Sequence, residues 1–339
     1  MIHLAEIDAD SPIPKYQQIV DAVSNSIKRG NLKRGQRLMS INEFSDEFLV
    51  SRVTVEKAYG ILKEQGIITS TAGKGYYINK TDIDVQIKVL LIFNKISNYK
   101  KDIYTAFLKT LGTKASVDLK IHHFNPQILK SLVENQINDY DYFVIMPHFY
   151  DNEKEAIETI NGIPAEKLLL LDKKIPGFQH KCGAVYQDFE NDIINALYDA
   201  LPLLHKYLHL VMVHSQIVPS PPEKITGFKK FCMQNRISNR VIHEINEETV
   251  VSKGNAYIVT EDTDLANLIK NCLRSKLKVG SDIGIISYNE TPLKEILLDG
   301  ITVISTDHAR MGSTAARLLL SNSCEQVKNP FELIKRASL

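Results

Sequence analysis

Residues 40–78 read SINEFSDEFLVSRVTVEKAYGILKEQGIITSTAGKGYYI, and this stretch decides the fold of the N-terminal part of the chain. Ser40, followed three positions later by Glu43, forms a capping box that predicts the start of a short helix. A turn follows, and Ser51 is placed to cap a second helix. The apolar positions of this second helix recur at helical spacing: Val55, Ala58, Tyr59 and Leu62.

The residues after the second helix predict a β-hairpin. Gly66 supplies the left-handed residue that commonly ends a helix. Residues 67–70 and 76–78 then read as two short strands joined by the glycine-bearing loop 71–75. A helix, a tight turn, a second helix and a hairpin in this order predict a winged helix-turn-helix.

A helix-turn-helix places the N-terminus of its second helix in the major groove of DNA. Ser51, Arg52 and Thr54 lie at that N-terminus, and Lys74 lies at the tip of the predicted wing, where it can reach a phosphate. The residues that we expect to contact DNA are Ser40, Asn42, Ser51, Arg52, Thr54, Lys57, Gly73 and Lys74.

Several short motifs in this region together indicate a family. They are Pro14-Lys15-Tyr16, Gly30, Gly35, Val50-Ser51-Arg52, Thr54-Val55, Ala58-Tyr59, Leu62, Gly66 and Gly73-Lys74-Gly75. From about Ile13 to Ile78 the chain resembles the DNA-binding domain of the gluconate-repressor (GntR) family. The resemblance implies operator contacts from Ser51, Arg52, Thr54 and Gly73.

The chain departs from that family at two places. Met39-Ser40-Ile41-Asn42 stands where the family usually has Pro-Ser-Glu-Arg, and Glu56 stands where a basic residue is often found. The operator sequence therefore cannot be inferred from the family.

Composition fits a small DNA-binding domain joined to a larger one. The chain has 339 residues, 44% of them hydrophobic and 24% charged, which is enough for two or three compact domains. The net charge is only +1, and the first 80 residues hold 11 Lys and Arg against 9 Asp and Glu. No broad basic surface is indicated, so the DNA prediction depends on where the basic residues are placed.

The sequence predicts a soluble, cytoplasmic protein without a membrane partner. No charged segment followed by an apolar core opens the chain, and no apolar run approaches the roughly 18 residues of a membrane span. The cysteines form no C-x-x-C pair, which argues against a zinc site or a disulfide framework and predicts buried thiols in a reducing compartment. They are Cys182, Cys232, Cys272 and Cys324.

The pattern changes after the polar residues 79–86. Residues 88–93 read KVLLIF, a continuous apolar run typical of a parallel strand that is buried on both faces. Strands, two of them predicted at 118–123 and 241–244, then alternate with helices to the C-terminus. This alternation predicts an α/β fold with two doubly wound lobes. The predicted organisation is a winged helix-turn-helix domain at 1–80, a linker at 81–87 and a two-lobed effector-binding and dimerisation domain at 88–339.

The second half shows another resemblance. Residues 278–320, together with Tyr140–Pro147, Lys224–Phe228 and 331–339, resemble segments of the lactose/galactose-repressor (LacI) effector domain. The resemblance implies a periplasmic-binding-protein-like fold. A gluconate-repressor-type N-terminal domain on such an effector domain is the arrangement of the arabinose-repressor subgroup of sugar-operon regulators.

Ligands of open α/β sheets bind outside the carboxyl ends of the strands, which here face a cleft between the lobes. Hydrogen-bonding side chains at these positions suit a polyhydroxylated ligand. The residues that we expect to bind an effector are Asn94, Lys95, His148, Asp172, Lys173, Lys224, Asp262 and Asn289. By resemblance, Asn289 stands where the family often has Asp and Lys224 where it often has Arg, so the effector stays open.

No motif for catalysis or for metal binding emerges. His122-His123 lacks a third ligand at a recognisable spacing and reads as a surface pair. Neither a G-x-S-x-G elbow nor a His-Glu-x-x-His sequence is present. We therefore expect no enzymatic activity, no cofactor and no metal.

The predicted function is a homodimeric transcription regulator that binds double-stranded operator DNA. A two-fold dimer requires a roughly palindromic operator. The resemblance implies a repressor of a carbohydrate-utilisation operon that is released by a sugar or sugar phosphate. Two alternatives remain at this point: an enzymatic, pyridoxal-phosphate aminotransferase-like body on the same kind of N-terminal domain, and a sugar receptor whose DNA-binding domain is vestigial.

Overall fold

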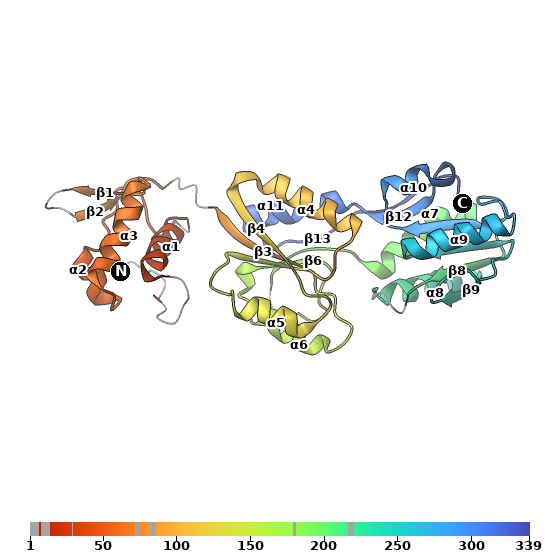
Figure 1. Cartoon of the computed structure of the whole chain (residues 1–339), viewed down its shortest axis with the longest axis horizontal. Coiled ribbons are helices and arrows are strands. Elements are labelled where there is room, and N and C mark those ends of the chain that lie inside the picture. The colour runs from red at the N-terminus through yellow and green to blue at the C-terminus, as the bar shows by residue number, and fades with distance from the viewer. Residues whose placement is uncertain are drawn as a thin grey trace. The chain divides into compact units, whose positions relative to one another are not determined.

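The computed structural model describes residues 7, 14–28, 30–71, 73, 75–81, 86–178, 181–215 and 220–339. By its internal contacts the chain divides into two compact units, Met1–Gln86 and Ile87–Leu339, which we call the head and the body. Figure 1 shows both along the chain.

The head is a winged helix-turn-helix, as predicted. Its elements are α1 (Lys15–Lys28), α2 (Ile41–Glu47), α3 (Arg52–Glu64), β1 (Ile68–Thr71) and β2 (Gly75–Ile78). The predicted capping box is present: the Ser40 backbone N–H donates to Glu43 Oε2 at 2.6 Å, and the Glu43 N–H donates to Ser40 Oγ at 3.2 Å. The four predicted apolar residues of α3 are all buried.

The wing is held to the helices by one further extended segment. Strands β1 and β2 are antiparallel. Residues 35–38 pair with the other edge of β2, where the Leu38 N–H donates to the Tyr76 carbonyl at 2.8 Å and the Ile78 N–H donates to the Gln36 carbonyl at 2.9 Å. The Tyr59 hydroxyl of α3 donates to the Met39 carbonyl at 2.8 Å. These bonds hold α3, the recognition helix of the helix-turn-helix, and the wing together.

The body contains two six-stranded sheets, each in its own lobe. The N-lobe (87–186 and 308–328) has the strand order β13-β7-β6-β5-β3-β4, and all of its pairings are parallel. The C-lobe (189–306 and 331–339) has the order β14-β12-β11-β10-β8-β9, and only β14 is antiparallel to its neighbour. The predicted two-lobed, doubly wound α/β fold is confirmed.

The elements of the body alternate along the chain as follows. The strands are β3 (Ile87–Phe93), β4 (Ala115–Ile121), β5 (Tyr142–Ile145), β6 (Leu168–Asp172), β7 (Gly183–Tyr186), β8 (His209–Val213), β9 (Ser238–Ile242), β10 (Asn255–Val259), β11 (Gly284–Tyr288), β12 (Thr302–Thr306), β13 (Gln326–Lys328) and β14 (Phe331–Ile334). The helices are α4 (Asn98–Leu111), α5 (Pro126–Glu134), α6 (Glu153–Asn161), α7 (Phe189–Leu204), α8 (Glu223–Gln234), α9 (Asp262–Arg274), α10 (Pro292–Ile296) and α11 (His308–Leu320).

Helices cover both faces of the N-lobe sheet, with α4 and α11 on one side and α5 and α6 on the other (Figure 1). The apolar run of β3 serves both faces. Val89 and Leu91 pack with α4 and α11, whereas Leu90 and Ile92 pack with α5 and α6. Burial of both faces of β3 explains the continuous hydrophobic run at 88–93.

The chain crosses between the lobes at three places: after β7, after β12 and after β13. The side chain of Asn329, which is 1% exposed, joins these crossings. Its Nδ2 donates to Thr306 Oγ1 at 2.7 Å and to the Asp307 carbonyl at 2.8 Å, and its backbone N–H donates to the Tyr186 carbonyl at 2.8 Å. All three crossings therefore meet at one residue.

Four sequence-based expectations need correction. The strands predicted at 118–123 and 241–244 begin about three residues earlier, as β4 and β9. Both are edge strands with mostly exposed side chains, so no apolar run marks their bounds. His122 is not a surface residue: it is fully buried, and its ring stacks on that of Phe149 with the ring centres 4.4 Å apart. Cys324 is exposed, unlike the other three cysteines.

The packing of α11 on α4 provides a test of the N-lobe. A Cβ added at Gly312 would overlap the backbone carbonyl of Ile103. Gly312→Ala should therefore lower the free energy of unfolding by about 1–3 kcal/mol, because backbone cannot move aside as a side-chain tip can. Urea denaturation of the full chain measures this. Ser313→Ala, at the next position, is the control and should change the value by less than about 0.5 kcal/mol. Equal effects of both substitutions would contradict the described helix contact.

Candidate functional site

The N-terminus of α3 is accessible. Ser51, Arg52 and Val53 are exposed there, with Val53 72% exposed. Leu49, in the preceding turn, is 88% exposed at a φ of +50°. A charged side chain beside exposed apolar ones suits base edges, which offer hydrogen-bonding atoms and thymine methyl groups.

The other predicted DNA contacts occupy several environments. The hydroxyls of Ser40 and Ser51 cap α2 and α3, and Ser51 Oγ lies 2.7 Å from Thr54 Oγ1. The ammonium group of Lys57 lies over the Tyr16 ring, 3.6 Å from its centre. Asn42 is exposed in the first turn of α2. Gly73 has a φ of +73° that favours glycine, and Lys74 lies outside the described residues.

The body holds a cavity of about 710 Å³ between its lobes. Residues at or after the carboxyl ends of β3, β5, β6, β10 and β11 line it, so the carboxyl ends of both sheets face the same space. Seven of the eight predicted effector residues line this cavity: Asn94, Lys95, His148, Asp172, Lys224, Asp262 and Asn289. Lys173 does not line it. Its Nζ instead lies 3.2 Å from Glu223 Oε1, whereas the side chain of Asp172 lines the cavity.

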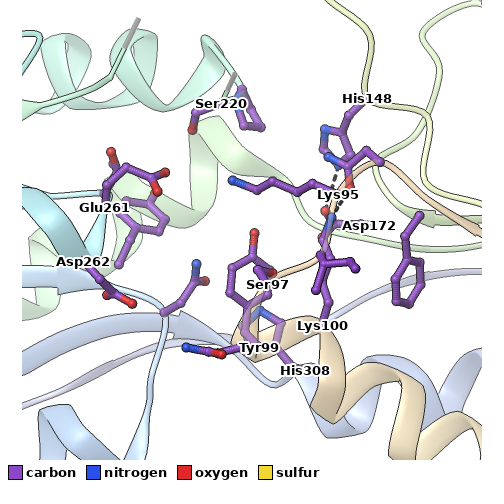
Figure 2. A pocket seen from close by; sticks show the side chains of 18 of the residues that line it. Lys95, Ser97, Tyr99, Lys100, His148, Asp172, Ser220, Glu261, Asp262 and His308 are labelled. Carbon is purple, nitrogen blue, oxygen red and sulfur yellow. Dashed lines mark hydrogen bonds and ion pairs between the residues drawn. The ribbon is translucent and has the colours of Figure 1, made fainter. Parts of the chain in front are cut away.

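Asp172 is the acidic centre of one side of the cavity. His148 Nε2 lies 2.7 Å from its Oδ2, and Gln187 Nε2 donates to its Oδ1. Burial raises the pKa of this carboxyl, but the hydrogen bond from His148 and the nearby charge of Lys100 outweigh burial and hold the pKa below its ordinary value. Burial lowers the pKa of His148, so a neutral ring donates its Nε2–H to the carboxylate. Figure 2 shows His148, Asp172, Lys95 and Lys100 grouped on one side of the pocket.

Two lysines of the cavity are almost completely buried. Lys100, in the first turn of α4, is 3% exposed, and its Nζ donates to Asn94 Oδ1. Lys224, in the first turn of α8, is 9% exposed, and its Nζ donates to Ser220 Oγ at 3.2 Å and lies 4.3 Å from the centre of the Tyr288 ring. Burial lowers the pKa of Lys100 to about 7 and that of Lys224 to about 8, although Asp172 opposes both shifts.

A third buried lysine has a structural role. Lys294 Nζ donates to the carbonyls of Tyr288 and Asn289 at 2.8 and 3.0 Å and lies 2.9 Å from Asp262 Oδ1. It thereby fixes the residues after β11, where Asn289 adopts a φ of +62° that Asn tolerates better than most residues. Asp262 is thus engaged by a lysine at the cavity rim.

The structure also brings residues to the cavity that the sequence did not single out. Lys100 and His308 come from the first turns of α4 and α11, Gln187 comes from a crossing between the lobes, and Tyr288 ends β11. The prediction considered residues at strand ends, together with Lys224 and Asp262, whose positions came from the family resemblance. A cation in the first turn of a helix, as at Lys100, was the available signal, because the helix dipole disfavours it there.

The winged helix-turn-helix of the head is matched by a known family of DNA-binding proteins. Residues 15–78 match the bacterial regulatory proteins of the gntR family. The head is similar to the DNA-binding domain of that family. Residues 214–339 match the periplasmic binding protein-like domain, so the chain joins a gntR-type head to a periplasmic-binding-protein-like body. The predicted combination is confirmed, and the aminotransferase-like body left open by the sequence is not what the chain carries.

Curated relatives match part of this chain. The mannosyl-D-glycerate transport/metabolism system repressor MngR of Escherichia coli K12 is 38% identical over 96 residues, which is 28% of this chain and 40% of MngR. The repressor NagR of Bacillus subtilis is 32% identical over 89 residues, 26% of this chain and 37% of NagR. The repressor YtrA of B. subtilis is 28% identical over 137 residues, 40% of this chain and all of YtrA. The chain therefore spans about two fifths of the length of MngR and NagR.

Solved structures resemble the body in fold. The trehalose repressor from E. coli has a TM-score of 0.61 and 16% identity, covering 74% of this chain and 100% of its own. The Lac repressor bound to ONPG has a TM-score of 0.61 and 19% identity, covering 86% of this chain and 92% of its own. Within the described part of the chain, no helix combines the length and apolar composition needed to cross a bilayer.

The lowered pKa of Lys100 predicts a pH-dependent stability. Between about pH 7 and its ordinary pKa of 10.5, the unfolded chain binds a proton that the folded chain releases, so this residue's contribution to stability rises with pH. Lys100→Met should therefore stabilise the protein most near about pH 7, and the gain should shrink by on the order of 1 kcal/mol per pH unit toward about pH 9.

Urea denaturation of the parent and the variant across this range measures the effect. Lys109→Met changes an exposed lysine of the same helix and is the control, for which the difference should stay constant with pH. A constant difference for Lys100→Met as well would show that its ammonium is solvated rather than buried.

Proposed function

We propose that this protein is a transcriptional repressor whose head binds operator DNA and whose body binds a carbohydrate effector. The observation that carries the proposal is a cavity between the two lobes, lined by charged, amide and aromatic side chains, in the same chain as a helix-turn-helix whose α3 has an exposed N-terminus. The relatives MngR, NagR and YtrA are described as repressors, which supports repression as the sign of regulation.

The head supplies the elements that operator binding needs. Arg52 is exposed at the N-terminus of α3 and can reach a guanine edge or a phosphate. Val53 and Leu49 expose apolar side chains next to it. The net charge of the chain is close to neutral, so affinity depends on this focused surface rather than on a broad electrostatic field.

The cavity supplies the contacts that a polyhydroxylated ligand needs. Carboxylates, amides, imidazoles and ammonium groups line it together with the rings of Phe93, Phe189 and Tyr288. Sugar hydroxyls require a partner each once water is excluded, and aromatic rings cover the apolar faces of a sugar. A sugar or a sugar phosphate therefore fits the chemistry of the lining.

The hinge offers a route from the cavity to the rest of the molecule. Gln187 lies in the first crossing between the lobes, lines the cavity and donates to Asp172. A ligand that displaces or tightens this contact acts directly on a segment whose geometry sets the angle between the lobes. In this proposal effector binding closes the lobes and so favours a state with lower operator affinity.

Two further parts of the proposal concern assembly and classification. We place the protein as a homodimer held by the body, since the head has little apolar surface left after building its own core. We also place it in the cytoplasm and in the arabinose-repressor subgroup, following the combination of its two domains.

Arg52→Ala tests the head. Loss of a base or phosphate contact should cost about 1–3 kcal/mol of operator affinity while leaving the fold intact. Fluorescence anisotropy with a labelled fragment from the gene's own upstream region measures the affinity. Lys63→Ala removes an exposed cation at the other end of α3 and is the matched control, for which affinity should change little. Unchanged binding by Arg52→Ala would refute the placement of the recognition helix.

Asn289→Gly tests the cavity. Glycine keeps the φ of +62° and removes only the side chain, so a lost hydrogen bond should weaken effector binding by about 0.5–1.5 kcal/mol. Operator affinity without effector should stay close to that of the parent. By linkage, operator DNA must weaken effector binding by the same factor by which effector weakens operator binding.

The measurement is operator binding across a titration with a sugar that raises the melting temperature in a screen. Asn152→Gly, at an exposed left-handed Asn that does not line the cavity, is the matched control. If Asn289→Gly responds to the sugar like Asn152→Gly, then Asn289 does not contact the effector.

A further inference from the structure

The cavity carries more positive than negative side chains. Five lysines line it, Lys95, Lys100, Lys101, Lys224 and Lys294, against three carboxylates, Asp172, Glu261 and Asp262. Asp262 is paired with Lys294 at 2.9 Å, and Asp172 accepts hydrogen bonds from His148 and Gln187. Among the described residues, no carboxylate lies within 4.0 Å of the ammonium group of Lys95, Lys100 or Lys224.

The positions of Lys100 and Lys224 are unfavourable in two respects. Each is at least nine-tenths buried, which disfavours the charged form. Each also lies in the first turn of a helix, α4 in the N-lobe and α8 in the C-lobe, where the helix dipole repels a cation. A side chain kept in such a position without an ion-pair partner indicates a role in binding an anion.

The three lysines also act on one another. The charge of Lys95 lowers the pKa of both Lys100 and Lys224, in addition to the larger effect of burial, so Lys95 lies electrostatically close to both. The remaining titratable groups that face them do not remove this excess. Burial lowers the pKa of His148 and His308, so their imidazoles favour the neutral form, and burial raises the pKa of Glu261.

We propose that the effector carries a negatively charged group, a phosphate or a carboxylate, and that this group binds at Lys95, Lys100 and Lys224. The inference rests on the proposed function, because it concerns the ligand of the same cavity. An anion would supply the missing counter-charge and would hold cations of both lobes together. A neutral sugar would leave the ammonium groups uncompensated while closure removed their remaining water, so closure around it would be less favourable.

The test uses matched sets of ligands that differ in charge. D-glucose, D-gluconate and D-glucose 6-phosphate form one set, and D-ribose with D-ribose 5-phosphate, and L-arabinose with L-arabinonate, form others. Thermal shift of the full chain ranks them, and calorimetry of any ligand that binds gives the affinity. Inorganic phosphate is included as a probe of the anion site alone.

We expect an anionic member to bind at least about tenfold more tightly than its neutral parent, as for a charge-assisted hydrogen bond. Its binding near about pH 8 should take up protons, visible as a heat that depends on the ionisation enthalpy of the buffer. The carboxylate and phosphate members of each set distinguish the two possible anions.

Variants assign the effect to the lysines. Lys100→Gln and Lys224→Gln should each reduce the preference for the anionic over the neutral ligand by about tenfold. Each should also reduce the affinity for inorganic phosphate by about tenfold. Lys109→Gln on α4 and Lys229→Gln on α8 remove exposed lysines of the same helices that do not line the cavity. These two variants should retain the preference for the anionic ligand. Circular dichroism confirms that all four variants are folded.

The outcomes separate this inference from the proposed function. A neutral sugar that binds as tightly as its anionic counterpart, or an absence of stabilisation by every anion including phosphate, would overturn the inference. An unchanged preference in both cavity variants would overturn it as well. An anionic sugar that binds through these lysines but leaves operator affinity unchanged would support the inference and refute the proposed regulation.

Discussion

The buried side chain of Asn329 joins the three segments that connect the lobes of the body, and the geometry of the cavity depends on this junction. It bonds to Thr306 and Asp307 in one crossing, while its backbone bonds to Tyr186 at the start of another. Because both sheets are essentially parallel, their carboxyl ends lie along single edges. Three short crossings tied at one point hold those two edges face to face around one shared cavity.

The proposed lobe closure depends on the chemistry of the cavity. Lys100 comes from the N-lobe and Lys224 from the C-lobe, and both are buried cations at helix N-termini. The charge of Lys95 acts on both of them, and in the proposed anion site a negatively charged ligand compensates all three lysines. Asp172, bonded to Gln187 in a crossing, connects the same electrostatics to the hinge. In the proposed function, the charge of the ligand and the geometry of the crossings therefore both affect lobe closure. A small molecule can in this way shift the equilibrium between an open and a closed state.

Much of this organisation was accessible from sequence patterns, though unevenly. The head was predicted to the level of individual caps, since Ser40, Glu43 and Ser51 act on backbone groups three residues away. Central strands such as β3 were located by their apolar runs, whereas the edge strands β4 and β9 were displaced because their side chains are exposed. The rule that ligands bind at strand ends found five cavity residues, and the family resemblance added Lys224 and Asp262. The rule included Lys173, which turns away to Glu223, and it missed Lys100, which reaches the cavity from a helix.

The sequence by itself determined the helix-turn-helix, the wing and the two-lobed α/β class, because these follow from caps, glycine positions and hydrophobic periodicity acting over a few residues. Only the tertiary structure decided which side chains share the cavity and in what state of charge. Residues 94, 148, 172, 224 and 289 are far apart along the chain and meet only once two sheets have formed and three crossings have aligned them. Burial, which lowers the pKa of Lys100 to about 7, is a property of that assembled surface, and no local pattern of residues encodes it.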